Sequence, residues 1–432
     1  MKRNEREDMA GRKEWFKLDL SGNVYPTLQK KSFSSTFRVS LTLKDEVKPE
    51  ILQKAFEQIM PRFPSFKVDL RKGFFWRYLE PNRRPLPKVE RDVKNPCMPM
   101  DFHSKHRYLI RIYYYQKQIA LEVFHSIADG LGALIFVKTL AAVYLRMQGV
   151  EIPNEEGILD IEEQPKACEL EDAYMKYANS KVTPKRSQGS AYRVRGTREP
   201  FYTLNIICGT MSVKELKATA KKYGVTITEY LNAVLIYALM EKQKSSRVWK
   251  EKPVRIAMPV NLRQFFPSST LRNFITMVYP GIDPRMGEYS FEEILKQVHY
   301  YMRYYLNGKF LNADITTNAK TLQSPFIRIV PLFLKDMVVK QFYKRVQDCQ
   351  SSAGLTNLGV VSLPKEMVSY VERFDVLMGH PFSARTNCAI ISYEGFTTVN
   401  FTSGIIESDV ERLFFRKLVE DGIQVTIRSN RN

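Results

Sequence analysis

Cysteine is scarce in this sequence, and the few cysteines lie far apart. The chain of 432 residues has 5 of them, with no C-x-x-C pair and an odd total. Neither a zinc knuckle nor a disulfide framework is encoded, and a reducing compartment fits best. Long apolar runs are lacking too. No stretch is long and apolar enough to span a bilayer, and no apolar segment of a secretory signal peptide follows the charged residues 1–15. We therefore expect a cytoplasmic protein.

Acidic residues are outnumbered by basic ones. The chain has 66 Lys+Arg and 46 Asp+Glu, a net charge of +20, and it is 44% hydrophobic with only 20 Gly and 22 Pro. This composition excludes collagen and low-complexity disorder. A basic surplus suits nucleic acid, a phosphate-bearing coenzyme or an anionic membrane surface. Because the basic residues are scattered, without an Arg/Gly-rich or helix-turn-helix pattern, nucleic acid is the minor alternative.

Periodicity predicts a mixed α/β half over residues 1–150. Apolar residues alternate in some segments and recur at helical spacing in others, which indicates strands and helices respectively. The expected elements are strands at 34–43, 66–70, 74–79, 108–115 and 118–124 and helices at 49–60 and 131–147. Gly149 is expected to end the last of these helices.

A second α/β half is predicted over residues 201–432, after a crossover linker over 151–200 whose composition changes from acidic to basic. No short-period repeat is present, which excludes solenoids and propellers. The expected elements are strands at 202–211, 254–259, 389–393 and 397–402 and helices at 213–223, 227–242, 290–306, 331–346 and 408–421. The chain therefore reads as two α/β halves.

One motif stands at the turn between the strand 118–124 and the helix that follows it, His125-Ser-Ile-Ala-Asp129-Gly130. A histidine at a strand end can take a proton from a hydroxyl or an amine, because its ordinary pKa is near neutrality. Asp129 precedes a glycine and a new helix, so we expect it in an ion pair that holds the loop. On spacing alone, an ordinary histidine followed by a helix-starting Asp-Gly remains the alternative.

This motif resembles the H-x-x-x-D-G signature of the acyl-CoA-dependent acyltransferase superfamily. That superfamily includes chloramphenicol acetyltransferase, peptide-synthetase condensation domains, and plant, polyketide-associated and alcohol acyltransferases, and its motif also lies about a third of the way along the chain. Pro259-Val-Asn261-Leu-Arg263, followed by Arg272-Asn273-Phe274, is similar to the family's V-[ND]-x-R segment and its closing Asn. Thr356-Asn357-Leu358-Gly359 is similar to the family's S-N-x-G stretch.

Two features depart from parts of the family. Phe124 occupies the position where some members have the first of two histidines, and the D-F-G-W-G segment of the plant branch is absent. The resemblance is therefore closest to bacterial alcohol acetyltransferases and polyketide-associated acyltransferases.

The resemblance implies an α/β fold of two chloramphenicol-acetyltransferase-like domains, with mixed sheets facing a shared central cleft or tunnel. It implies acyl-CoA, such as acetyl-CoA, as co-substrate, an alcohol or another hydroxyl compound as acceptor, and neither a permanently bound cofactor nor a metal. His125 would be the general base of an O-acylation, and Asp129 would pair with Arg263 across the domain interface.

The same motifs assign the remaining site residues. The residues expected to be catalytic are His125, Asp129 and Gly130; those expected to hold the ion pair or position substrate are Arg263, Asn261 and Asn273; those expected near the oxyanion are Asn357, Thr356 and the backbone near Gly130. For Asn357 a turn before Gly359 is an equal alternative. Asn273 has the alternative of ordering the loop after Arg263.

Two rival functions stay open. One is a condensation-type or polyketide-associated acyltransferase that takes the acyl group from an acidic acyl carrier protein, which a basic surface would also attract. The other is a non-catalytic binding protein of the same fold.

The other histidines and one helix have plainer interpretations. His103 and His106 have H-x-x-H spacing without further ligands, His299 is expected to be packed or at the surface, and His380 lies in a loop. The basic amphipathic helix 331–346 could lie on an anionic membrane or flank an acceptor tunnel, but packing of its apolar side into the core is favoured.

Overall fold

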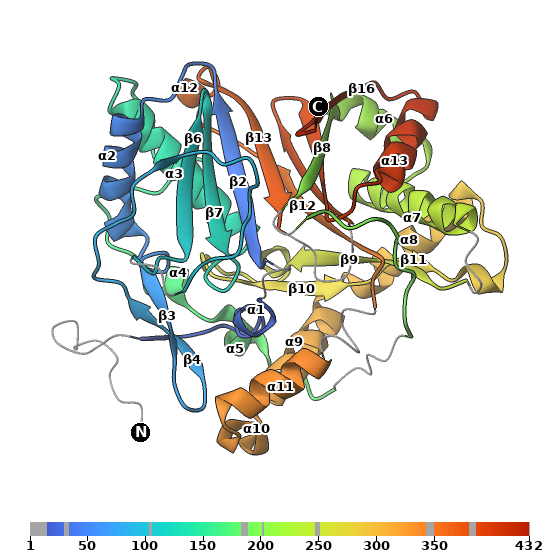
Figure 1. Ribbon diagram of the computed structural model, residues 1–432, viewed down its shortest axis with the longest axis horizontal. Helices are drawn as coiled ribbons and strands as arrows, with labels where there is room; N and C mark the ends of the chain where they lie inside the picture. The colour runs from blue at the N-terminus through green and yellow to red at the C-terminus, as the bar shows by residue number, and fades with distance from the viewer. Residues whose placement is uncertain are drawn as a thin grey trace.

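The computed structural model describes residues 15–29, 34–102, 106–182, 189–200, 203–246, 251–342, 350–379 and 386–431. In this part of the chain two α/β halves lie side by side, each built on a sheet that helices cover (Figure 1). The mixed α/β class expected from the sequence is confirmed.

The first half is built on a five-stranded sheet among the described residues. Its strands, in spatial order, are β13 (Val371–Met378), β2 (Thr36–Leu43), β7 (Gln118–Phe124), β6 (Ile110–Tyr115) and β5 (Glu90–Arg91). Helices α2 (Pro49–Ile59) and α3 (Gly130–Arg146) pack against each other, and α3 lies on β2 and β7. Helix α3 begins where the Asp129 carboxylate caps it, accepting from Gly132 N at 3.1 Å, and Gly149 follows its end with φ +87°.

One strand of this sheet comes from the far end of the sequence. Strand β13 pairs antiparallel with β2 over most of its length and also packs against β14 and β15 of the second half. The Phe374 and Tyr393 rings meet at 5.2 Å. The chain therefore returns to the first half after residue 370, and this return joins the two sheets.

The second half is built on a larger sheet, eight-stranded among the described residues. Its strands, in spatial order, are β10 (Ile275–Val278), β9 (Val254–Asn261), β12 (Ala353–Val360), β14 (Thr386–Tyr393), β15 (Phe396–Ser403), β8 (Asn205–Ser212) and β16 (Val425–Ser429), and β11 (Gly281–Ile282) pairs with β9. β12 runs parallel to β9 and β14, and the other pairings are antiparallel.

Four helices cover this second sheet. They are α6 (Val213–Lys222), α7 (Ile227–Ser245), α8 (Phe291–Tyr305) and α13 (Asp409–Glu420). Capping boxes start α7 at Thr226 with Glu229 and α8 at Ser290 with Glu293. Among the described residues no single helix has both the length and the apolar composition of a membrane span, and the pair α6 and α7, bent by 80°, meets those criteria only jointly.

A third, small sheet and a group of helices form the underside in Figure 1. The sheet has the order β1 (Phe16–Lys17), β4 (Arg77–Pro81), β3 (Val68–Lys72). The helices nearby are α1 (Tyr25–Leu28), α9 (Gly308–Gln323), α10 (Pro325–Ile329) and α11 (Leu332–Phe342). The other short helices are α4 (Ala167–Leu170), α5 (Ala173–Tyr177), which packs against α9, and α12 (Lys365–Val368). 3₁₀ turns lie at Met60–Arg62, Leu262–Gln264 and Pro284–Met286.

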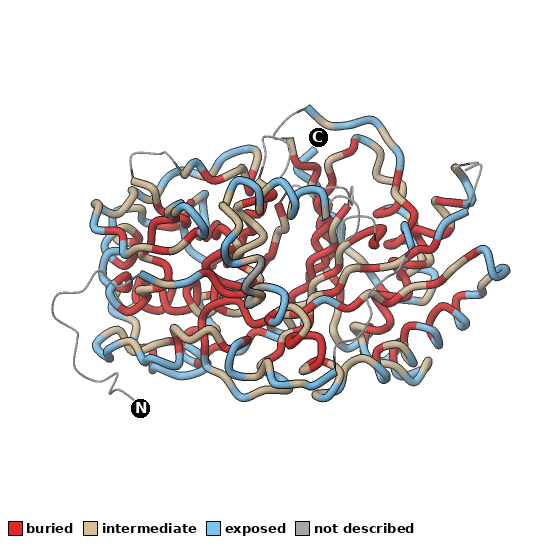
Figure 2. The backbone as a smooth tube through the Cα atoms, turned by 90° about the horizontal axis from the view of Figure 1, so that it is seen from below, coloured by how far each residue is buried: buried red, intermediate tan, exposed pale blue. Residues whose placement is uncertain are grey.

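Each half has its own hydrophobic core, and Figure 2 shows buried residues gathered in the interior of both halves. A smaller apolar cluster lies where the N-terminal segment, the crossover and α9 meet, and it contains Leu20, Tyr174, Leu262, Phe274 and Leu311. Tyr174 of the crossover is therefore packed with residues of both halves. The domain boundaries at residues 150 and 200 stay a prediction.

Replacing Phe374 by alanine tests whether β13 is essential to the first half. Its ring is 1% exposed, so Phe374→Ala is expected to lower the free energy of unfolding by about 3–5 kcal/mol. Urea-induced unfolding followed by circular dichroism measures this. The matched control is Glu372→Ala, an exposed residue of the same strand, which should leave the transition in place. Equal transitions for the two variants would contradict the structural role of β13.

Candidate functional site

His125 stands at the end of β7, on the turn that leads into α3. Its backbone N–H donates to Ser35 O at 2.9 Å, which extends the β2–β7 pairing by one residue. Its ring stacks on Tyr25 with centroids 4.5 Å apart and an interplanar angle of 14°, and it meets Phe37 at 4.8 Å. Two aromatic side chains therefore hold the imidazole in one orientation.

Asn273 determines which ring nitrogen of His125 carries the proton. The Asn273 amide nitrogen donates to His125 O at 2.9 Å and to Asp19 Oδ2 at 3.1 Å. With its nitrogen facing two acceptors, the amide must present its oxygen to His125 Nδ1, which lies 3.0 Å away. Since an amide oxygen only accepts, Nδ1 is the donor. In the neutral ring, Nε2 is then the basic nitrogen.

Burial lowers the pKa of His125 below its ordinary value, because the imidazolium is poorly solvated there. Hydrogen bonding to the backbone and to Asn273 and the charges of Asp129 and Asp19 act in the opposite direction without reversing the shift. Burial likewise raises the pKa of Asp19, against the nearby Arg272 guanidinium. The site therefore favours a neutral imidazole near neutral pH.

The ion pair expected between Asp129 and Arg263 is present. Arg263 Nη1 lies 2.7 Å from Asp129 Oδ2, and both side chains are less than a tenth exposed. The Asp129 carboxylate also accepts from Gly132 N and, at 3.0 Å, from Phe274 N. A carboxylate from the first half thereby anchors a loop of the second half.

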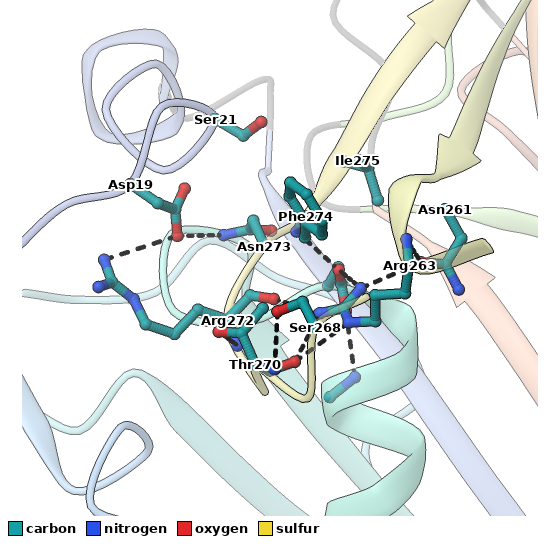
Figure 3. Close-up of polar contacts among 12 residues, drawn as sticks. Asp19, Ser21, Asn261, Arg263, Ser268, Thr270, Arg272, Asn273, Phe274 and Ile275 are labelled. Atoms are coloured by element: carbon teal, nitrogen blue, oxygen red, sulfur yellow. Dashed lines mark hydrogen bonds and ion pairs between the residues drawn. The ribbon is translucent and has the colours of Figure 1, made fainter. Parts of the chain in front are cut away.

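Arg263 organises the whole loop that follows it (Figure 3). Besides the ion pair, its guanidinium donates to Thr270 O at 2.8 Å, to Arg272 O at 2.6 Å and to Asn261 Oδ1 at 3.2 Å. Asn261 Oδ1 also accepts from Arg263 N at 3.1 Å. The residues 263–274 are therefore folded around one guanidinium, and Asn261 supports that guanidinium directly.

Two glycines of the first half allow the second half to approach closely. A Cβ at Gly132 would lie 2.1 Å from the Leu271 carbonyl oxygen, and a Cβ at Gly130 would lie 3.2 Å from the Leu358 side chain. Leu271 belongs to the Arg263 loop and Leu358 to β12. The start of α3 is thus in contact with two segments of the second half.

The predicted oxyanion residues lie on β12, where the pairing with β14 is irregular between Asn357 and Val360 and Gly359 has φ +79°. Asn357 donates from its amide to Thr228 Oγ1 at 2.9 Å and accepts from Gly359 N at 2.8 Å. These contacts match the turn alternative. Thr356 is half-buried on the same strand. The oxyanion roles of both residues stay predictions.

Three residues around His125 were not found by sequence reasoning. They are Asp19, Tyr25 and Phe37. Asp19 reaches the site from a tight turn in which Gly22 N donates to its Oδ1 at 2.6 Å, and Ser126 Oγ donates to Gly22 O at 2.9 Å. Ser21, Gly22 and Asn23 signal this turn in the sequence, but nothing local indicates that it packs on residue 126.

The other histidines lie apart from this arrangement. His106 Nδ1 lies 3.2 Å from Pro85 O, and His299 Nδ1 lies 3.3 Å from Glu229 Oε2. His103 and His380 fall outside the described residues. In the part of the chain that the structure describes, no group of three His, Cys, Asp or Glu side chains could hold a metal ion. A cavity of about 540 Å³ lies between α13 and the strands β8 and β16, and none of the site residues lines it.

The alcohol acetyltransferase family model matches residues 175–374, a little under half of the chain, and this range includes Arg263, Asn273 and Asn357 but not His125. A search of curated protein sequences found no match.

Solved structures match over nearly the whole chain. Polyketide synthase associated protein 5 from Mycobacterium tuberculosis is 13% identical with a TM-score of 0.58, covering 93% of this chain and 97% of its own. The wax ester synthase/diacylglycerol acyltransferase from Marinobacter aquaeolei VT8 is 14% identical with a TM-score of 0.54, covering 94% and 99%. TRI101 of F. graminearum, complexed with coenzyme A and T-2 mycotoxin, is 12% identical with a TM-score of 0.61, covering 95% and 99%. The resemblance to acyl-CoA-dependent acyltransferases is therefore borne out in two respects: residues 175–374 are similar to the alcohol acetyltransferase family, and nearly the whole chain has the two-half α/β fold of these solved structures.

Proposed function

We propose that this protein is an acyltransferase that moves an acetyl or longer acyl group from a CoA thioester to an alcohol hydroxyl, with His125 as the general base. The family match supports acyl transfer as the class of chemistry. The observation that carries the finer proposal is the contact of His125 Nδ1 with Asn273 Oδ1, because it leaves Nε2 as the basic nitrogen.

The proposed reaction needs one base and no covalent enzyme intermediate. Nε2 of His125 takes the proton of the acceptor hydroxyl as its oxygen attacks the thioester carbonyl carbon. The tetrahedral oxyanion then collapses, the C–S bond breaks, and the thiolate recovers the proton from Nε2. Asp129 and Arg263 do not exchange protons in this scheme; they hold the loop that carries Asn273 and so position the base.

The net charge of +20 supports a donor that bears phosphates. The same charge would also attract an acidic acyl carrier protein, so the carrier-bound donor is the second candidate. The two candidates differ in whether free acyl-CoA is sufficient as the acyl donor. The acceptor is proposed as an alcohol because the matching family is that of alcohol acetyltransferases.

Removing the His125 imidazole tests the assignment of the base. His125→Ala is expected to reduce acceptor-dependent release of the CoA thiol by about a hundred- to ten-thousandfold, the usual contribution of a general base. The measurement is thiol release from acetyl-CoA and longer acyl-CoAs with a panel of alcohols and amines. His106→Ala, a histidine outside the site, is the matched control and should retain wild-type rates.

Three other results would change the proposal. If His125→Ala releases the CoA thiol as fast as the wild type, His125 has no part in the mechanism. Activity only with an acylated carrier protein would establish the second candidate. Absence of transfer from either donor to any acceptor would favour the non-catalytic binding protein.

The pH dependence follows from the lowered pKa of His125. Only the neutral imidazole accepts a proton. We therefore expect kcat/KM to be at its maximum above the pKa of His125 in the folded enzyme and to fall as the pH drops through that pKa. Because burial lowers that pKa, the fall should be centred below the ordinary value of about 6.5. Initial rates across acidic to mildly alkaline pH measure this. A midpoint above the ordinary value would contradict the buried, neutral base.

Arg263 should matter for stability as well as for activity. Arg263→Met leaves the Asp129 carboxylate buried without its cation, and loss of one partner of such a pair costs about 3–5 kcal/mol. Arg263→Lys is not expected to restore the wild type, because an ammonium cannot reach Thr270 O, Arg272 O and Asp129 together. Urea unfolding and thiol release measure both effects. Arg285→Met, an exposed arginine paired within its own turn, is the control and should behave as wild type. Full rescue by lysine would contradict the role of the guanidinium.

A further inference from the structure

Helix α11 turns its apolar stripe toward solvent. Phe333, Leu334, Met337 and Val338 recur at helical spacing and are 67%, 38%, 58% and 61% exposed. The interpretation that favoured core packing for this stripe is therefore wrong for α11. A helix that exposes its apolar side on a folded protein marks a surface that something covers.

The tip of the β3–β4 hairpin continues this surface. Phe74, Phe75 and Trp76 stand consecutively at the tip and are 70%, 38% and 46% exposed. Leu332 N donates to Phe74 O at 2.8 Å, and Lys335 Nζ donates to Phe75 O at 2.9 Å and lies 4.2 Å from the Trp76 ring centre. Hairpin and helix thus form one surface, the lowest part of the molecule in Figure 1 and the side from which Figure 2 is viewed. We call residues 72–76 with 328–340 the hairpin–helix face.

The orientation of α11 is held from the opposite side. Asp336 forms a two-pronged ion pair with Arg77, at 2.5 and 2.9 Å, and accepts from Thr27 Oγ1 at 2.9 Å. Arg77 is 7% exposed. Because the polar side of the helix is fixed to the protein body, the apolar side must face outward.

The charges on this face are mostly basic. Lys72, Arg328, Lys335 and Lys340 lie on or beside the apolar residues. Asp336 is the single acidic residue of segment 325–342, and Arg77 neutralises it. Aromatic and aliphatic side chains flanked by lysine and arginine match the boundary of an anionic bilayer, where rings insert at headgroup depth and cations meet lipid phosphates.

We propose that the hairpin–helix face docks this protein peripherally on anionic lipid membranes. The apolar side chains of α11 and the hairpin tip insert into the interfacial region, and the basic residues bind anionic headgroups. Helix α1 joins the face to the site. Its Thr27 side chain donates to Asp336 of α11, and its Tyr25 ring stacks on His125. The candidate base therefore lies one short helix behind the docked surface.

Vesicle flotation with the full chain tests this, without any substrate. The probes are phosphatidylcholine vesicles with and without phosphatidylglycerol as the anionic lipid. We expect binding to the anionic vesicles that is roughly tenfold or more tighter than to the neutral ones and that weakens with salt. The tryptophan fluorescence of the chain, to which Trp76 contributes as one of 3 tryptophans, should shift to shorter wavelength on binding, and the shift should be lost in Trp76→Phe.

Two variants separate the apolar and the basic contributions. Phe333→Ser with Met337→Ser should weaken binding to anionic vesicles by about tenfold or more, because two inserted side chains are lost. Lys72→Glu with Lys340→Glu should remove the preference for anionic lipid. Met286→Ser with Val419→Ser, which are 80% and 58% exposed on the second half, is the matched control and should bind as wild type. Unchanged thermal unfolding shows that each variant is folded.

Several outcomes would overturn the proposal. These are absence of binding to anionic vesicles by the wild type, equal binding by the Phe333/Met337 variant, or an equal loss in the control. If size-exclusion chromatography instead showed a dimer that Phe333→Ser with Met337→Ser converts to monomers, with no vesicle binding, the face would be an interface between two copies of this chain.

Discussion

The buried ion pair between Asp129 and Arg263 is the contact on which the site depends. Its carboxylate caps α3 of the first half, and its guanidinium gathers the carbonyl groups of residues 270 and 272 from the second. Neither charge is stable alone in that environment, so each half requires the other to be in place. The glycines at 130 and 132 permit this closeness, because a side chain at Gly132 would collide with the Leu271 carbonyl.

The chemistry of His125 follows from this assembly. Strand β7 brings the ring to the junction, but the segments that define its state come from elsewhere: Asn273 from the Arg263 loop, and Asp19 and Tyr25 from the N-terminal segment. An amide held by two acceptors presents its oxygen to Nδ1, which makes Nε2 the base. The ion pair, the loop and the tautomer are thus successive consequences of one interface.

The N-terminal segment that carries Asp19 and Tyr25 also contacts the hairpin–helix face. Its helix α1 contacts His125 on one side and α11 on the other. Helix α11 has its polar side fixed by Arg77 and its apolar side free, which reverses the usual arrangement of an amphipathic helix on a globular protein. The 4-residue helix α1 therefore links the candidate site, at the junction of the two halves, to the hairpin–helix face.

The sequence by itself determined the local structure and the principal motif. Alternation predicted β2, β6 and β7, the Asp-Gly pair and the glycine at 149 bounded α3, and the H-x-x-x-D-G resemblance indicated His125 and the Asp129–Arg263 pair. Only the tertiary structure decided the remainder. Strand β13 joins the first sheet, Asn273 contacts His125, 148 positions away in the sequence, and Asp19 contacts Asn273, 254 positions away. Periodicity records which side of a segment is apolar, whereas the topology decides what that side meets, and for α11 it meets solvent.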